Sequence, residues 1–382
     1  MKKMTIVVTV PLVLETWFKN QPKFLSKYYE VEIITAYSEN VESISEHENV
    51  NIKTMDFTRK INFIKDIKVL LQLFWYFIVN RPSIVYTLTP KAGLLGMIAS
   101  WFAFVPNRVH NVVGLPHLEA NGKRKIILML SERLTYWFSS KIYCNSFNLK
   151  KEIECKMTKK PVNVIGNGSV NGVDTEYFKD NLTKKEKEKI SKSIKINSND
   201  FVITFVGRIV KDKGINELVN VFSSLKQEHN RIKLLLIGDY EDDLDPISNE
   251  TKKIINEDQN ILQINFQQDI RNYLAISDLF VLPSYREGLP NVLIEAGSYG
   301  IPLVATDING CNEIIIEGKN GTLINKKDED SLFHAINKFI VDKEYYQDIK
   351  KNVRESIYQR YEQKYFFDKL HDEFINIELS SK

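Results

Sequence analysis

The sequence predicts an α/β protein with two doubly wound, parallel-sheet domains, and three observations support this fold class. Short runs rich in Val, Ile and Leu recur along the whole chain and alternate with stretches of helical character. The runs are nearly continuous in hydrophobicity rather than alternating, which is typical of strands buried on both faces of a parallel sheet. The chain has 382 residues, enough for two domains with separate cores.

The expected strands fall into two series along the chain. The first series comprises residues 4–10, 29–37, 83–89, 107–114, 140–146 and 163–169. The second series comprises residues 201–208, 232–239, 261–266, 278–284, 301–307 and 321–325. The helical stretches between them imply repeated strand–helix–strand units.

A polar stretch at residues 179–200 separates the two series, so a domain boundary lies nearby. We expect a first domain at residues 1–165, a second at residues 166–364, and a helix at residues 365–382 that returns to the first domain. Two such domains in tandem place a cleft between them, and ligands of these sheets bind outside the carboxyl ends of the strands.

Composition excludes several classes of protein. The three cysteines form no Cys-x-x-Cys pair, which argues against a thiolate zinc site or a disulfide framework. The first apolar run fits a buried strand better than a signal peptide, which predicts a cytoplasmic protein. The apolar runs at residues 69–79 and 92–105 are shorter than the roughly 18–20 residues that span a bilayer.

Charge is distributed unevenly between the two halves. Residues 1–165 contain 23 Lys and Arg against 13 Asp and Glu, a net charge of +10, whereas the remainder contains 29 against 36, a net charge of −7. A basic first half indicates an anionic partner, such as nucleic acid, a membrane surface or a phosphorylated substrate.

The second series of strands opens with a basic turn at residues 205–214. An expected strand ends at Gly207, Arg208 and Lys213 follow, and Gly214 precedes a helix. Cations at the carboxyl end of a strand suit a diphosphate, because Arg offers a fork of donors and Lys a point charge. The alternative is an ordinary basic surface turn.

Two carboxylates lie around a later strand–helix junction. Glu287 lies on the loop after the expected strand, Pro290 is near the start of the next helix, and Glu295 lies on that helix. The first N–H groups of such a helix bind phosphate, and Gly288 allows close approach of the backbone. The alternative is a solvated loop Glu and a surface helix Glu.

Histidines and a paired aspartate motif are further candidates for a site. Asp243 and Asp245 imitate a metal-binding Asp-x-Asp motif, but they lie in an acidic run before a Pro, which favours a solvated loop. We therefore expect no metal and no cofactor. His110 is expected to be a core histidine, and His117, which follows a Gly-Leu-Pro turn, is either a site residue or a solvated loop residue.

Residues 207–214, 279–315 and 320–324 resemble the retaining glycosyltransferases of family 4, which have the GT-B fold of two Rossmann-like domains facing a cleft. The two glutamates separated by seven residues are characteristic of that family. Residues 107–146 resemble the branch that builds bacterial capsule and O-antigen repeat units on a lipid carrier, nearest to the capsular N-acetylfucosaminyltransferases.

The resemblance implies roles for the candidate donor-site residues. Arg208 and Lys213 would hold the nucleotide diphosphate, and Glu295 would bind the ribose. Glu287 would act in catalysis on the donor sugar, beside the backbone N–H groups of Gly288 and Leu289. No metal would be required, because cations and a helix N-terminus neutralise the diphosphate.

The first half is expected to receive the acceptor. His117 would lie near the anomeric carbon of the donor, and Lys123, Arg124 and Lys125 would form a basic loop that meets the acceptor diphosphate. Residues 59–77 mix Lys with aromatic side chains as interfacial helices do. The aromatic residues expected to insert into a membrane are Phe63, Phe74, Trp75 and Tyr76.

The predicted function is transfer of a sugar, N-acetylfucosamine or a similar N-acetylaminosugar, from a UDP-sugar to a polyprenyl-diphosphate-linked saccharide. The enzyme would lie on the inner face of the plasma membrane, on an anionic surface. One alternative is a hydrolysing UDP-sugar 2-epimerase of the same fold. The other is a nucleic-acid-binding protein, although the basic residues are scattered and show no recognition motif.

Overall fold

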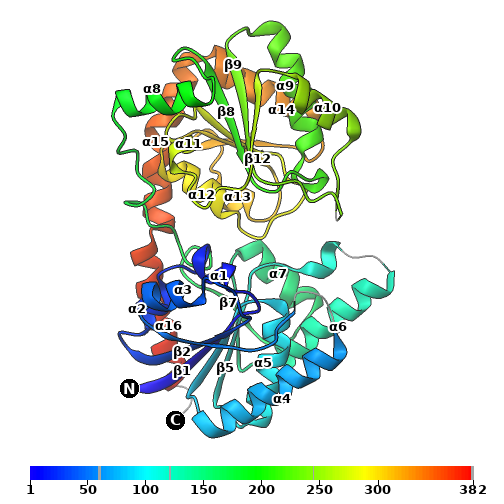
Figure 1. Cartoon of the computed structure of the whole chain (residues 1–382), viewed down its shortest axis with the longest axis vertical. Helices are drawn as coiled ribbons and strands as arrows, with labels where there is room; N and C mark the ends of the chain where they lie inside the picture. The colour runs from blue at the N-terminus through cyan, green and yellow to red at the C-terminus, as the bar shows by residue number, and fades with distance from the viewer. Residues whose placement is uncertain (59–61, 120–121, 244, 380–382) are drawn as a thin grey trace. The chain divides into compact units, whose positions relative to one another are not determined.

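The computed structural model describes residues 1–58, 62–119, 122–243 and 245–379. The chain forms two units, the first joining Met1–Gly172 to Gln363–Lys382 and the second comprising Val173–Glu362 (Figure 1). The chain thus passes from the first unit to the second after Gly172, whereas the sequence analysis expected this boundary after residue 165. Helix α16 (Gln363–Leu379) belongs to the first unit. Residues 59–61 of the expected interfacial stretch and residues 380–382 of the expected last helix lie outside the described part.

The first unit contains a seven-stranded parallel sheet in the order β3-β2-β1-β4-β5-β6-β7. Its strands are β1 (Lys2–Val7), β2 (Tyr29–Thr35), β3 (Asn51–Thr54), β4 (Ile84–Thr87), β5 (Asn107–Val112), β6 (Lys141–Cys144) and β7 (Val162–Val164). In the interior strand β1, Met4 pairs with Val31 on one side and with Ile84 on the other, and all three are buried. The continuous apolar runs thus form strands covered on both faces, as their composition predicted.

No expected strand covers β3, which lies at the edge of this sheet. Its sequence, Asn-Ile-Lys-Thr, is largely exposed and lacks an apolar run. An edge strand has only one neighbour and less to bury, so its pattern of hydrophobicity is weaker than that of a central strand.

Helices cover both faces of the first sheet. They are α1 (Leu12–Glu15), α2 (Gln21–Leu25), α3 (Val41–Glu48), α4 (Phe63–Asn80), α5 (Pro90–Phe102), the 3-10 helix η1 (Pro116–Glu119), α6 (Gly122–Phe138), α7 (Phe147–Lys156) and α16. Helix α5 packs against both α4 and α6 (Figure 1). It lies so close to the sheet at Gly93 that a Cβ there would be 2.4 Å from His110 Cε1. Only glycine therefore fits at this position.

His110 is a core residue of this sheet, as its sequence position predicted. It is 2% exposed, and its Nδ1 lies 2.8 Å from Thr87 Oγ1 on the neighbouring strand. Burial lowers the pKa of His110 to about 3, so the imidazole is neutral.

No helix in the described ranges combines the length and the apolar character needed to cross a bilayer.

The second unit contains a six-stranded parallel sheet in the order β10-β9-β8-β11-β12-β13. Its strands are β8 (Phe201–Val206), β9 (Ile232–Ile237), β10 (Ile261–Ile264), β11 (Leu279–Leu282), β12 (Leu303–Thr306) and β13 (Gly321–Ile324). Its helices are α8 (Lys184–Ser193), η2 (Lys211–Lys213), α9 (Ile215–Glu228), α10 (Asn249–Glu257), α11 (Arg271–Leu274), α12 (Asn291–Ser298), α13 (Cys311–Ile314), α14 (Glu329–Val341) and α15 (Lys343–Tyr361). One contiguous apolar core fills this unit.

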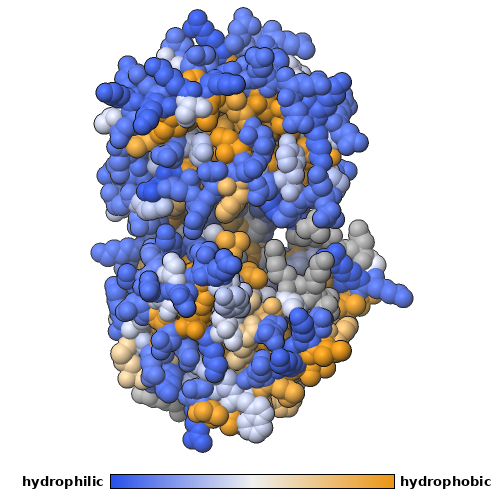
Figure 2. Space-filling view, viewed as in Figure 1, coloured by the Kyte–Doolittle hydropathy of each residue, from blue (hydrophilic) through white to orange (hydrophobic). Residues whose placement is uncertain are grey.

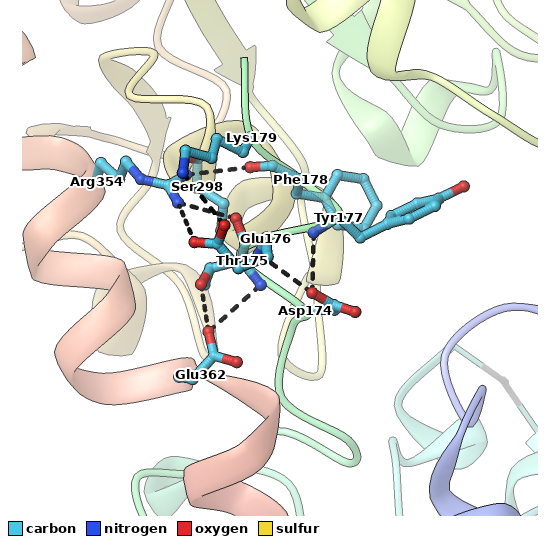
Figure 3. Close-up of polar contacts among 9 residues, drawn as sticks. All are labelled: Asp174, Thr175, Glu176, Tyr177, Phe178, Lys179, Ser298, Arg354 and Glu362. Atoms are coloured by element: carbon cyan, nitrogen blue, oxygen red, sulfur yellow. Dashed lines mark hydrogen bonds and ion pairs between the residues drawn. The ribbon is translucent and has the colours of Figure 1, made fainter. Parts of the chain in front are cut away.

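The two ends of the second unit are tied to each other. Val173 donates its N–H to the Tyr361 carbonyl at 2.8 Å, and the Thr175 hydroxyl donates to the Glu362 carboxylate. Figure 3 shows Arg354 of α15 reaching over the same segment, where it donates to the carbonyls of Thr175 (2.9 Å) and of Ser298 at the end of α12. The entering segment is therefore fixed to both α12 and α15.

Candidate active site

The carboxyl ends of β8 and β11 meet where the strand order of the second unit reverses. Strand β8 leads to β9 and β10 on one side of the sheet, and β11 begins the series on its other side. Ligands of doubly wound sheets bind at such a switch point. The basic turn follows β8 and the loop that carries Glu287 follows β11, so the fold brings the two predicted clusters together.

Lys213 and Glu287 form an ion pair at this edge, although they are 74 residues apart. The Lys213 Nζ lies 2.6 Å from Glu287 Oε1, and their side chains are only 17% and 12% exposed. The pair is therefore largely shielded from water, where a charge-assisted hydrogen bond is stronger than at the surface. The sequence predicted both residues for the site but not their contact.

Arg208 has a different carboxylate partner. Its Nη1 lies 2.6 Å from Glu241 Oε2, on the loop after β9, and the Arg208 side chain is about half exposed. The sequence analysis did not single out Glu241. Its contact explains how the Arg208 guanidinium, which follows the flexible Gly207, is held over the end of the sheet.

A second ion pair supports the basic turn from below. The Arg286 guanidinium contacts the Asp212 carboxylate, and the Asp212 N–H donates to Asp245 Oδ2 at 2.7 Å. Burial raises the pKa of Asp212, and the neighbouring cations Lys213 and Arg208 oppose that rise. Asp245 of the Asp-x-Asp sequence thus anchors η2, and the described residues contain no group of three or more His, Cys, Asp or Glu side chains arranged to hold a metal.

Close backbone contacts fix the loop around Glu287. The Asn309 amide donates to the carbonyls of Glu287 (3.3 Å) and Gly288 (3.4 Å). Gly310 has a φ of +80°, and a Cβ there would lie 2.0 Å from the Gly288 oxygen, so only glycine permits this approach. The Asn-Gly pair was quoted within the family resemblance, but its role was not inferred. The Leu289 side chain is buried, so its backbone is the part available for the role that the sequence predicted.

Helix α12 presents the second carboxylate of the motif. The helix begins at Asn291, and Pro290 precedes it as an extended residue. Glu295 is half-buried, and its carboxylate has no hydrogen-bond or ion-pair partner in the described part of the chain. Burial raises the pKa of Glu295 to about 7. A half-buried carboxylate without a protein partner is an acceptor prepared for an external donor.

Tyr177 and Arg271 lie close to Glu295 and were missed in the sequence. The Arg271 guanidinium carbon lies 3.8 Å from the centre of the Tyr177 ring, and Asp269 holds the guanidinium through two nitrogens. Burial, then the charges of Asp269 and others including Glu295, raise the pKa of Tyr177. Tyr177 lies in a polar, irregular segment of the sequence, where no periodic signal identifies it.

In the first unit, His117 lies in η1 and packs against α6. It is 3% exposed, and its Nδ1 has no hydrogen-bond partner among the described residues, so the interpretation as a solvated loop residue is wrong. Burial, assisted by the positive charge of Lys125, lowers the pKa of His117, which keeps the imidazole neutral at pH 7.

Lys123, Arg124 and Lys125 do not form a loop, as the sequence predicted, but belong to the first turn of α6. All three side chains are exposed. The expectation failed because cations at a helix N-terminus oppose the helix dipole, so a basic run after Asn121-Gly122 does not read as a helix start. The expected aromatic insertion is wrong for Tyr76, which is buried, and Phe74 is half-buried, whereas Phe63 and Trp75 are exposed.

Comparisons with known proteins place this geometry in a family. Residues 186–356 match the profile of glycosyl transferases group 1. The chain is 30% identical to the capsular polysaccharide biosynthesis glycosyltransferase CapM of Staphylococcus aureus, over 96% of this chain and 94% of that one. It is 31% identical to the UDP-Gal:alpha-D-GlcNAc-diphosphoundecaprenol alpha-1,3-galactosyltransferase of Escherichia coli, over 84% and 82% of the two chains.

Solved structures agree at the level of the fold. The crystal structure of Anabaena Alr3699/HepE in complex with UDP and glucose aligns with a TM-score of 0.80 at 20% identity and covers 98% of this chain and 99% of that one. The protein is therefore a glycosyltransferase with the GT-B fold, made of two Rossmann-like units. It belongs to the glycosyl transferases group 1 family and acts in polysaccharide biosynthesis.

Proposed function

We propose that this glycosyltransferase moves a sugar from a UDP-sugar to a polyprenyl-diphosphate-linked saccharide in capsular repeat-unit synthesis, with retention of the anomeric configuration. The observation that carries the proposal is the shielded Lys213–Glu287 pair at the switch point of the second sheet. The names of the two relatives support it, because one specifies capsular polysaccharide and the other a UDP-sugar with a diphosphoundecaprenol-linked acceptor.

The donor diphosphate would replace the carboxylates that now contact two cations. Arg208 and Lys213 now contact Glu241 and Glu287, and a diphosphate offers more acceptor oxygens and a higher charge than either carboxylate. Glu295 would accept hydrogen bonds from the ribose diol, and the absence of a hydrogen-bond or ion-pair partner for its carboxylate among the described residues supports this role.

The reaction exchanges one bond at the anomeric carbon of the donor. The bond to the diphosphate breaks, and the acceptor hydroxyl oxygen bonds to the same carbon on the same face while its proton passes to the departing diphosphate. Arg208, Lys213 and the N–H groups at Gly288 and Leu289 would stabilise the departing negative charge, so no divalent cation is required. Glu287 would contact the donor sugar through this step.

The acceptor half of the reaction belongs to the first unit in this proposal. Neutral His117 would lie near the anomeric carbon, where an uncharged imidazole can accept or donate a hydrogen bond. Lys123, Arg124 and Lys125 would contact the acceptor diphosphate. Because the acceptor is anchored in lipid, the enzyme would work as a peripheral protein on the inner face of the plasma membrane.

The donor sugar is proposed to be a UDP-N-acetylaminosugar such as UDP-N-acetylfucosamine, on the resemblance of residues 107–146 to capsular N-acetylfucosaminyltransferases. A panel of nucleotide sugars, each offered with a set of lipid-linked monosaccharides, tests donor and acceptor together. We expect turnover with one UDP-N-acetylaminosugar and a product whose anomeric configuration matches the donor by NMR.

Two variants serve as controls in that panel. Glu287→Ala should abolish turnover, whereas Glu344→Ala, an exposed glutamate at the start of α15, should leave it unchanged. Inversion at the anomeric carbon would refute retention. Release of free sugar or its epimer from the UDP-sugar, without transfer to any acceptor, would favour the epimerase alternative instead.

A further inference from the structure

Helix α4 carries large apolar side chains on two opposite faces, and the fold covers only one of them. Val69, Leu73 and Phe77 are buried in the core of the first unit. The opposite face follows a spacing of three and four residues, and each of its members is more than half exposed: Ile64, Ile67, Leu71, Trp75 and Val79. A helix in contact with water on this face would normally be polar there.

Helix α6 shows the same feature in a stronger form. Its outward side chains are between 46% and 62% exposed: Ile126, Ile127, Leu130, Leu134 and Trp137. Its inward face, by contrast, buries the Glu132 carboxyl, which accepts a 2.5 Å hydrogen bond from Tyr136, and the hydroxyl of Thr135. The polarity of α6 is thus inverted relative to that of a helix on a water-exposed surface.

Helix α5 joins the two faces into one. It lies between α4 and α6, with Leu94 and Ile98 half-buried and Trp101 exposed at its end. The Trp101 and Trp137 rings are 6.0 Å apart, so the apolar surface continues from α5 to α6. Figure 2 shows apolar residues gathered along the lower right of the first unit, over α4 and α6. We call this surface the α4–α6 face.

Exposed cations border the α4–α6 face. Lys65 lies on α4, and Lys123, Arg124 and Lys125 lie in the first turn of α6; none of the four forms a side-chain hydrogen bond or ion pair with a carboxylate among the described residues. Lys68, and after it Lys65, lower the pKa of the nearby exposed Asp56. The three cations of α6 also oppose the helix dipole, which an adjacent anion would correct. A groove of about 580 Å³ between α4 and the edge strand β3 extends the face, with Leu71 and Trp75 in its wall and Lys53 and Lys68 beside them.

We infer that the α4–α6 face is the surface with which the enzyme lies on an anionic lipid bilayer, with its apolar side chains among the acyl chains and its cations among the lipid phosphates. Trp75, Trp101 and Trp137, one on each helix, suit this position, because indole rings concentrate where hydrocarbon meets headgroups. A second copy of the chain fits less well, since protein interfaces are depleted in lysine. The inference rests on the proposed function, which requires an acceptor held in a membrane.

Binding of the full chain to lipid vesicles tests the face without any acceptor. We expect flotation with phosphatidylcholine vesicles that contain phosphatidylglycerol, and much weaker binding to phosphatidylcholine alone. The triple variant Ile67→Glu, Leu71→Glu, Leu134→Glu should bind the anionic vesicles at least roughly tenfold more weakly. These side chains are exposed, so the variant should fold, and unchanged UDP affinity will verify that it has.

A matched control and a second readout keep the test specific. Val341→Glu alters an equally exposed apolar residue in the second unit and should not change vesicle binding. The chain has four tryptophans, and three lie on the face. Single-tryptophan variants that retain Trp75, Trp101 or Trp137 should be quenched by brominated lipid, whereas one that retains half-buried Trp17 should not.

Three outcomes decide the inference. Loss of vesicle binding in the triple variant, together with quenching of the three exposed indoles, supports it. Vesicle binding that is unchanged in the triple variant overturns it, as does a dimer that the same substitutions convert to a monomer without affecting lipid. If the unaltered enzyme binds vesicles through this face but transfers no sugar to lipid-linked acceptors, the proposed function fails while the docking surface stands.

Discussion

The two units hold their candidate site cations in opposite ways. In the second unit, Arg208 and Lys213 each contact a carboxylate from a distant part of the chain. In the first unit, Lys123, Arg124 and Lys125 project from α6, and the described residues offer them no carboxylate. Paired cations keep a fixed geometry before a ligand arrives, which suits a compact diphosphate. Unpaired cations on an exposed turn suit an extended anionic surface, where position matters less than number.

The largest expected effect breaks the paired arrangement at its carboxylate. Glu287→Ala should lower turnover by roughly a hundredfold or more, because the group proposed to contact the donor sugar is lost. Free UDP should bind with equal or higher affinity, since Lys213 loses its competing partner. Steady-state kinetics and calorimetry with UDP measure the two effects, and a parallel loss of turnover and UDP affinity would contradict this role.

The next effect comes from the cations. Arg208→Ala and Lys213→Ala should each weaken UDP binding by about 1.5–3 kcal/mol, because each removes a charge-assisted hydrogen bond to the diphosphate. Lys213→Ala should cost more, since Lys213 is less exposed and its loss leaves Glu287 unpaired in a shielded site. Lys343→Ala, on the surface of α15, is the control. UDP affinity near that of the unaltered enzyme in both variants would remove them from the site.

Glu295 should affect a different end of the donor. Glu295→Gln should weaken the binding of free UDP and of the UDP-sugar alike, by about 1–2 kcal/mol, because the carboxylate is proposed to contact the ribose that both ligands contain. In the unaltered enzyme UDP affinity should rise with pH through about 7, where Glu295 ionises, and the variant should lose this dependence. Weakening of the UDP-sugar alone would show that Glu295 binds the sugar instead.

The same substitution should change stability in a pH-dependent manner. Burial raises the pKa of Glu295 from 4.5 to about 7, so between these values the folded state keeps a proton that the unfolded state has lost. The carboxyl therefore lowers stability as pH rises through this window. Glu295→Gln should stabilise the enzyme by about 1–3 kcal/mol above pH 7 and have little effect below about pH 4. Denaturant unfolding at the two extremes checks the sign.

The smallest expected effect is that of a chelator. Excess chelator should leave activity unchanged, because Arg208, Lys213 and the start of α12 are proposed to neutralise the diphosphate without a metal. Asp245, half of the candidate Asp-x-Asp motif, already accepts the Asp212 N–H. Activity that disappears with chelator and returns with Mg²⁺ or Mn²⁺ would assign those aspartates to a metal site.

Most of the fold could be predicted because buried strands are rich in Val, Ile and Leu and can be recognised by this composition. Apart from β3, each described strand overlaps an expected apolar run. Most of these strands are buried, whereas the edge strands β7, β10 and β13 are only partly buried. The exceptions have local causes: β3 is a polar edge strand, and the start of α6 carries cations where the helix dipole disfavours them. The boundary between the two units after Gly172 lies in a Gly- and Asn-rich turn, and the sequence indicates the position of this boundary only to within several residues.

For the candidate site, the sequence indicated residue types but not the contacts between them. The motif spacing indicated Glu287, Glu295, Arg208 and Lys213, yet the pairing of Lys213 with Glu287 depends on strands that are adjacent only in the folded sheet. Glu241, Asn309 and Arg271 were missed for the same reason, since each acts through a partner remote in sequence. The inverted polarity of α6 was also hidden, because both of its faces contain apolar residues.

The return of the chain through α16 imposes an order on biosynthesis. Phe374 packs against Tyr29 and Tyr86 in the core of the first unit, so that core is incomplete until α16 has been synthesised. The second unit is continuous in sequence and precedes α16, so it can fold before the first unit is complete. A chain truncated after Glu362 should therefore resist protease over the second unit and be cut within the first. Equal resistance of both units at that length would show that α16 is not needed to complete the amino-terminal fold.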